Sequence, residues 1–211
     1  DWVRLLHGEQ AFEILKPLRP GATYVGNYRV LGVVDKGAGK GALLFLRKER
    51  REKGSADIVS TVDSTYFMRG DGGCGGTGME APAPHAIPDR APDSSITISI
   101  LPRAALIYRL SGDYNPIHAD PVTARKAGFD RPILHGLCSL GVATRAIVQA
   151  ACDDKAEHLR SLSLRFSSPV YPGETLVTEL WRDGNVVSFR SRVAERDIVV
   201  LNNGQATVSA S

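Results

Sequence analysis

The stretch GLCSLGVATRAIVQAA, residues 136–151, decides the fold that this sequence predicts. Its apolar residues recur with the spacing of one helical face. We expect the buried side of this helix to carry Leu137, Leu140, Ala143, Ile147, Val148 and Ala151. Small residues between them allow such a helix to lie close against a sheet. The sequence therefore predicts one long, buried helix over residues 136–151.

Strand-like segments follow this helix to the end of the chain. They are rich in apolar and β-branched residues, and they cover 161–166, 175–181, 186–193 and 198–208. The Asp183-Gly184 pair predicts a tight hairpin between two of them. A long helix followed by an antiparallel meander that wraps it is typical of the α+β "hot dog" fold.

The first half of the chain carries a shorter version of the same pattern. The phrase P-x-x-P-G-x-T begins at Pro17 and again at Pro169, and strand-like segments follow the first copy over 23–34, 42–49 and 56–67. Such internal repetition predicts a double hot-dog fold, with antiparallel sheets wrapped around a long central helix. The first half lacks its own helix, so we expect that an N-terminal segment is missing from the chain as given.

Gly and Pro crowd residues 68–93, which excludes a helix or a central strand there. We therefore place the boundary between the two repeats in this region. The predicted organisation is an incomplete N-terminal repeat over 1–80, a Gly/Pro-rich linker over 81–93 and a catalytic C-terminal repeat over 94–211.

Composition narrows the class of protein. The chain has 211 residues, 43% of them hydrophobic, and a formal net charge of +3 without a dense Lys/Arg stripe, which argues against a nucleic-acid partner. Three cysteines, an odd number, argue against a disulfide framework and favour a reducing compartment or a peroxisome-like lumen. No uninterrupted apolar stretch approaches about 18 residues, so we expect no membrane span.

The polar segment SGDYNPIHADP, residues 111–121, contains the candidate catalytic residues. Pro116 stiffens the chain between Asp113 and His118, so that an extended-then-turning loop can aim both side chains at one point. A carboxylate and an imidazole around one water form an acid–base pair. Downstream, Gly136 begins the long helix, where a free N–H can stabilise a developing oxyanion. These groups together indicate addition of water to, or its removal from, an unsaturated thioester.

The stretches YRLSGDYNPIHADP (108–121) and AGFDRPILHGLCSLG (127–141) closely resemble the (R)-specific 2-enoyl-CoA hydratases, the hydratase 2 branch of the MaoC-like family. LHGEQ (6–10) and LRFSSPVYPGETL (164–176) extend the resemblance over nearly the whole chain. It implies hydration of trans-2-enoyl-CoA to (3R)-3-hydroxyacyl-CoA in fatty-acid β-oxidation, without a metal or a redox cofactor. It further implies a homodimer, and a peroxisomal location in a eukaryote or a cytoplasmic one otherwise. It fits both a separate enzyme and a part of a longer multifunctional chain.

The resemblance also implies roles for individual residues. Asp113 and His118 match the acid–base pair, Asn115 matches the asparagine that holds it and the water, and Gly136 matches the oxyanion donor. The residues that match contacts to the acyl-CoA are His7, Gly8, Lys36, Tyr114, Pro116, Ile117 and Phe166. Cys74 departs from the family pattern, which has a bulky aromatic residue at that position.

Several alternatives stay open at this point. A thioester hydrolase and an acyl-carrier-protein dehydratase use the same scaffold, and a catalytically silent acyl-CoA-binding module is a third possibility. A metal site built on His118 and Asp120 lacks further ligands at a suitable spacing. We interpret His135 as a structural residue at the helix start, Cys138 as a small apolar filler, and GAGKG (37–41) as a turn.

Overall fold

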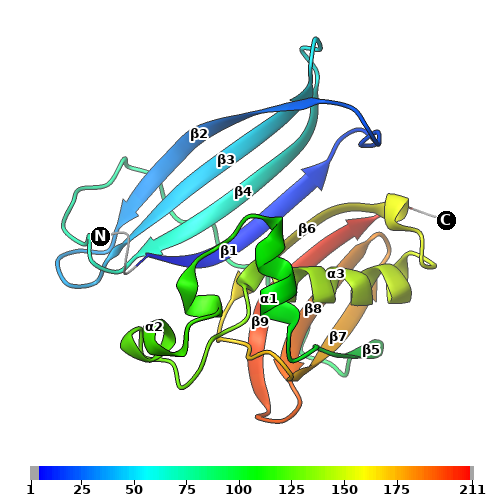
Figure 1. Ribbon diagram of the computed structural model, residues 1–211. Helices are drawn as coiled ribbons and strands as arrows, with labels where there is room; N and C mark the ends of the chain where they lie inside the picture. The colour runs from blue at the N-terminus through cyan, green and yellow to red at the C-terminus, as the bar shows by residue number, and fades with distance from the viewer. Residues whose placement is uncertain (1–4, 210–211) are drawn as a thin grey trace.

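The computed structural model describes residues 5–209, so the ends of both predicted repeats, residues 1–4 and 210–211, lie outside the described residues. Nine strands form one antiparallel sheet in the order β2-β3-β4-β1-β6-β9-β8-β7-β5 (Figure 1). The strands are β1 Leu5–Ile14, β2 Tyr24–Asp35, β3 Ala42–Glu52, β4 Ile58–Met68, β5 Ser94–Ser99, β6 Leu159–Phe166, β7 Thr175–Asp183, β8 Val186–Val193 and β9 Ile198–Val208. The helices are α1 Ala104–Tyr108, α2 Pro121–Lys126 and α3 Gly136–Ala151. The predicted α+β hot-dog fold is confirmed.

The strand order of the sheet contains the same pattern twice, which divides the strands into two repeats. Strands β1–β4 run in the order β1-β4-β3-β2, and strands β6–β9 run in the matching order β6-β9-β8-β7. The two copies of P-x-x-P-G-x-T lie at equivalent places, between β1 and β2 and between β6 and β7. Within residues 5–68 the first repeat has strands and no helix, whereas the second repeat has β5 and α3 in addition.

Strand β1 joins the repeats, and the sequence pattern did not predict it as a strand. It pairs antiparallel with β4 on one side and with β6 on the other, where Phe12 lies opposite Leu162. The strand carries His7 and Gln10 on its inner face and Glu9 and Glu13 on its outer face. Polar residues on both faces hide the apolar alternation by which a half-buried strand is recognised.

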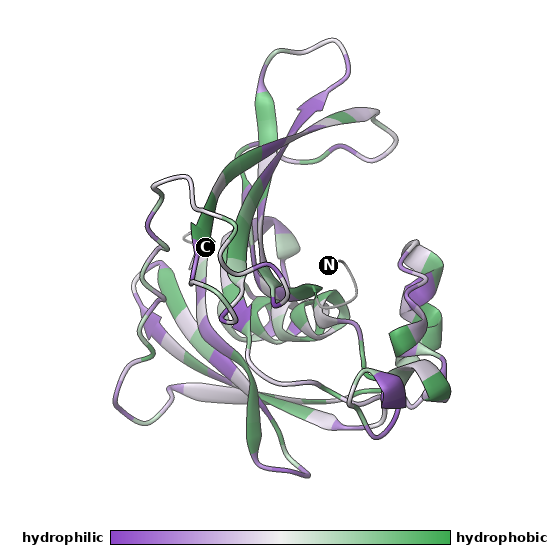
Figure 2. Ribbon diagram, turned by 90° about the vertical axis from the view of Figure 1, so that its left-hand side faces the viewer, coloured by the Kyte–Doolittle hydropathy of each residue, from purple (hydrophilic) through white to green (hydrophobic). Residues whose placement is uncertain are grey.

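The sheet curves around α3, which lies on its concave side in the second repeat (Figures 1 and 2). Ala143, Ala146 and Ile147 of α3 are fully buried, and the helix contacts all five strands of its repeat. The largest side chains of this core include Phe189, Leu162, Leu176 and Leu201. The small residues let the helix approach closely, as the sequence predicted, and this packing fixes where its N-terminus points. None of the helices between residues 5 and 209 has the length and apolar character to span a bilayer.

The glycine-rich segment after β4 is anchored to the β2–β3 turn by hydrogen bonds. The carboxylate of Asp35 accepts hydrogen bonds from the backbone N–H groups of Gly37, Gly73 and Gly75, at 2.8, 2.8 and 2.7 Å. A Cβ atom at Gly72 would lie 2.2 Å from the carbonyl oxygen of Gly37. The glycines therefore allow the segment to pack backbone against backbone on the β2–β3 turn.

We predict that Ile147→Ala lowers the free energy of unfolding by about 2–5 kcal/mol, because it leaves a cavity between α3 and the sheet. Ile147 is 0% exposed. Gln149, exposed on the same helix, gives the matched control, and Gln149→Ala should change stability by less than about 0.5 kcal/mol. Urea unfolding followed by circular dichroism measures both, and equal midpoints would contradict the assigned orientation of α3.

Candidate active site

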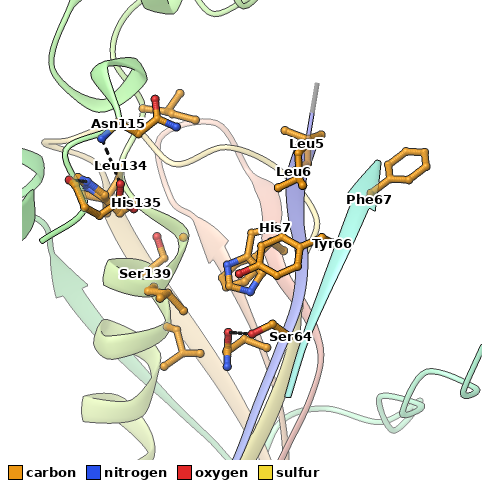
Figure 3. Close-up of a pocket in the computed structure, with 18 of the residues that line it drawn as sticks. Leu5, Leu6, His7, Ser64, Tyr66, Phe67, Asn115, Leu134, His135 and Ser139 are labelled. Atoms are coloured by element: carbon orange, nitrogen blue, oxygen red, sulfur yellow. Dashed lines mark hydrogen bonds between the residues drawn. The ribbon is translucent and has the colours of Figure 1, made fainter. Parts of the chain in front are cut away.

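A cavity of about 1080 Å³ lies between the two repeats. Residues of β1, β3 and β4 form one wall, and the 113–118 loop, residues 133–140 and Phe166 form the other. Figure 3 shows His7, Ser64 and Tyr66 on the β1–β4 side facing Leu134, His135 and Ser139 on the opposite wall. The cavity therefore requires both repeats, because each repeat contributes one of its walls.

The loop between α1 and α2 turns tightly before it meets this cavity. Asn115 has an extended backbone conformation, at φ −53° and ψ 121°, and Pro116 starts a single 3-10 turn over Pro116–His118. The backbone N–H of Asn115 donates to Asp113 Oδ1, and the backbone N–H of Ile117 donates to Asn115 Oδ1, both at 3.2 Å. Asn115 thus caps the turn that brings His118 back toward Asp113.

Asp113 and His118 meet at one end of the cavity. A carboxylate oxygen of Asp113 and one ring nitrogen each of His118 and His135 all lie within 4.8 Å of one another. A water molecule that makes two hydrogen bonds of about 2.8 Å bridges polar atoms separated by 4–5 Å. The Asp113 carboxylate and the His118 imidazole are therefore close enough for one water to bond to both.

The protonation state of His118 follows from its contacts. Its Nδ1 lies 2.8 Å from the carbonyl oxygen of Ile133, so Nδ1 carries the hydrogen and Nε2 has a free lone pair. Burial is the main influence on its pKa and lowers it, and the neighbouring His135 lowers it further, against the raising effects of the Ile133 carbonyl and Asp113. At neutral pH His118 is thus a neutral imidazole that can accept a proton.

Gly136 is the first residue of α3 and lines the same cavity. A Cβ atom at this position would lie 3.2 Å from the ring of Phe166, closer than side chains normally pack. The N–H groups of the first helical turn have no intrahelical partner and sit at the positive end of the helix dipole. The helix start can therefore donate a hydrogen bond to a carbonyl oxygen bound beside Phe166.

The structure places the predicted substrate contacts in two groups. His7, Gly8, Ile117 and Phe166 line the cavity. Lys36, Tyr114 and Pro116 do not line it. Tyr114 is 62% exposed, and the Arg109 guanidinium lies 5.5 Å from its ring centroid.

Lys36 lies beside the cavity. Its ammonium nitrogen is 5.1 Å from the ring centroid of Phe67, and Phe67 does line the cavity.

Several residues of the β1–β4 wall were not predicted from the sequence. Tyr66 stacks on His7 with ring centroids 5.0 Å apart, and Ser64 donates a hydrogen bond of 3.0 Å to Gln10. Burial lowers the pKa of His7, whose Nε2 is buried without a partner among the described residues. Residues 62, 64 and 66 alternate along β4, so the period of a strand was the signal that could have found this wall.

A metal ion could be held by one cluster among residues 5–209, namely Asp113, His118 and His135. The two imidazole rings stack with centroids 3.7 Å apart and planes inclined by 26°. Their lone pairs therefore lie in nearly parallel planes, which suits hydrogen bonding better than tetrahedral ligation. Asp120 caps α2 instead, accepting from the N–H groups of Val122 and Thr123 at 3.0 and 3.1 Å.

The surroundings of Cys138 favour the structural role that the sequence predicted for it. Burial raises the pKa of its thiol, so the thiolate that a nucleophile requires is disfavoured.

Comparisons with known proteins identify the family to which this sequence and fold are similar. Residues 84–203 match the family described as "MaoC like domain", and residues 1–70 match "MFE-2 hydratase 2 N-terminal domain". The chain is 41% identical over 206 residues to "Enoyl-CoA hydratase 2, peroxisomal" of Arabidopsis thaliana, covering 93% of this chain and 66% of that protein. It is 36% identical over 205 residues to "Peroxisomal multifunctional enzyme type 2" of Mus musculus, covering 96% of this chain and 27% of that protein. The crystal structure of a MaoC-like dehydratase from Phytophthora capsici matches with a TM-score of 0.93 and 39% identity, over 100% of this chain and 74% of that one.

We predict that His118 titrates below 6.5, its ordinary value, in the folded protein. Burial penalises the imidazolium, and the unfolded chain therefore binds this proton more tightly than the native state does. The contribution of His118 to folding stability should accordingly fall as the pH drops through about 6.5. Titration of the ¹⁵N-labelled imidazole by NMR measures the midpoint, and a value above 7 would contradict the burial argument.

Proposed function

Because the chain belongs to the MaoC-like family, we propose that it hydrates trans-2-enoyl-CoA to (3R)-3-hydroxyacyl-CoA in fatty-acid β-oxidation. The observation that carries the proposal is the meeting of Asp113, His118 and the start of α3 at one cavity. The match of residues 1–70 to a hydratase 2 N-terminal domain supports the same reaction.

The reaction divides among these groups as follows. A water held between Asp113 and His118 attacks C3 of the substrate and gives up a proton to the pair. The electrons of the C2–C3 double bond move toward the thioester carbonyl, and the Gly136 N–H stabilises the enolate oxygen that forms. The pair then returns a proton to C2. Either group can take the water proton, because the Asp113 carboxylate and the His118 Nε2 each offer a lone pair beside the water.

Asn115 positions the pair through its two hydrogen bonds within the 113–117 turn. It therefore acts on the geometry of Asp113 and His118.

The substrate thioester lies, in this proposal, against Phe166 and the 113–118 loop, with His7 and Gly8 on the opposite wall. Lys36 lies beside cavity-lining Phe67, and Arg69 lines the cavity near the same strand end. These two cations suit the phosphates of CoA, which carry negative charge. The acyl chain then extends along the inner face of the first repeat, past Leu46 and Val62.

We propose that the reaction uses no metal and no redox cofactor. Addition of water needs a base, an acid and a site for negative charge, and the chain's own groups supply all three. We also propose a homodimer, and a peroxisomal location in a eukaryotic source, in line with the Arabidopsis relative's name. The mouse relative, of which this chain covers 27%, supports a place within a longer multifunctional protein.

We predict that Asp113→Asn and His118→Gln each lower kcat for trans-2-enoyl-CoA hydration by about 10²–10⁴-fold, since each removes one member of the acid–base pair. Asp120→Asn is the matched control from the same loop: it removes a carboxylate but keeps an N-capping side chain. It should retain activity within about 2-fold. Loss of the conjugated absorbance of the substrate measures the rate.

Product analysis of the same reaction tests the assignment further. The proposal requires a (3R)-hydroxyacyl-CoA with its thioester intact. Release of free CoA thiol would indicate a hydrolase, an S product would contradict the stereochemistry, and wild-type rates in the Asp113 and His118 variants would contradict the mechanism.

We predict that Gly136→Ala lowers kcat by about 10- to 100-fold, because the added methyl group meets the ring of Phe166 and shifts the oxyanion donor. Gly141→Ala, on an exposed position of the same helix with no heavy atom within 4 Å of the added Cβ, is the control. It should leave kcat unchanged and raise the thermal midpoint slightly. Equal kinetics for the two variants would rule out the proposed donor.

A further inference from the structure

His135 is placed unlike an ordinary residue at a helix start. It occupies the N-cap position of α3, yet its side chain makes no capping hydrogen bond. Its side chain is 1% exposed and turns instead toward the catalytic loop, where Nε2 lies 3.2 Å from the backbone carbonyl oxygen of Asp113. The imidazole is thus committed to the loop and makes no hydrogen bond to its own helix.

The hydrogen bond to Asp113 fixes the tautomer of His135. A carbonyl oxygen only accepts, so Nε2 must carry the hydrogen. Its Nδ1 is buried and has no hydrogen-bond partner within residues 5–209. The ring therefore has one polar contact among the described residues, and that contact holds the residue that supplies the catalytic carboxylate.

The faces of the His135 ring are also occupied. His118 stacks on it with ring centroids 3.7 Å apart, and Tyr108 lies 4.7 Å away at an interplanar angle of 44°. His135 therefore touches both members of the pair, through a hydrogen bond to Asp113 and through ring contact with His118. Its own main chain leads directly into Gly136, so one residue connects the pair to the oxyanion donor.

We propose that His135 is a positioning residue for the hydration reaction, and that its Nε2–H, by holding the Asp113 carbonyl, sets the distance between the acid–base pair and the start of α3. The inference rests on the proposed function. Its physical basis is that misplacement of a catalytic group by about 1 Å can cost about 10²-fold in rate. Binding of the substrate draws on the whole cavity and depends little on this one hydrogen bond.

Two variants separate the hydrogen bond from the ring. His135→Phe keeps an aromatic face for His118 and removes the donor, whereas His135→Gln removes the ring and keeps an N–H near the position of Nε2. We expect His135→Phe to lower kcat about 10- to 100-fold with KM within about 3-fold of wild type. We expect His135→Gln to retain kcat within about 5-fold. Circular dichroism and thermal unfolding check that both variants fold.

A kcat of His135→Phe equal to wild type, or His135→Gln as impaired as His135→Phe, would overturn the proposal. The wild-type protein provides a test that needs no variant. Long-range ¹H–¹⁵N NMR spectra should show His135 as the Nε2–H tautomer, and an Nδ1–H tautomer would overturn the proposal even if a variant fails to fold. Absence of hydratase activity in the wild type would instead contradict the proposed function, whatever the tautomer.

Discussion

Strand β1 is paired on both of its edges, with β4 of its own repeat and with β6 of the other. This ten-residue strand turns two small sheets into one curved sheet of nine strands. The cavity exists because of that pairing: His7 and Gly8 of β1 and residues of β4 face the 113–118 loop only while the two repeats stay in register. A slip of one residue would exchange the inner and outer faces of β1 and move His7 out of the cavity.

The packing of helix α3 is the second constraint on the site, after the pairing of β1. Its buried side packs on all five strands of the second repeat, and its first residue, Gly136, opens into the cavity beside Phe166. The residues that pack the helix against the sheet therefore also determine where its N-terminus, the positive end of the helix dipole, lies. The same burial that stabilises this region lowers the pKa of His118 and keeps it ready to accept a proton at neutral pH.

The loop from Asp113 to His118 is held from three directions. Asn115 caps it from within, the Ile133 carbonyl accepts from His118, and His135 contacts the Asp113 carbonyl. Asp113 itself is exposed to the cavity side of the molecule, so its carboxylate is reachable while its backbone is fixed. Fixed backbone and accessible side chain are the combination that acid–base catalysis needs, since the reacting groups must be aligned before the substrate arrives.

The sequence by itself determined the elements with strong local signals. The long helix over 136–151, the last two strands, the duplicated turn phrase and the rigid Asp113–His118 loop each follow from spacing, Gly and Pro over a few residues. Only the tertiary structure decided the role of β1, the Tyr66 and Ser64 wall, and the contact of His135 with the pair. These depend on residues distant along the chain that the sheet brings together. A strand that turns polar side chains into a cavity lacks the apolar alternation that sequence patterns can detect.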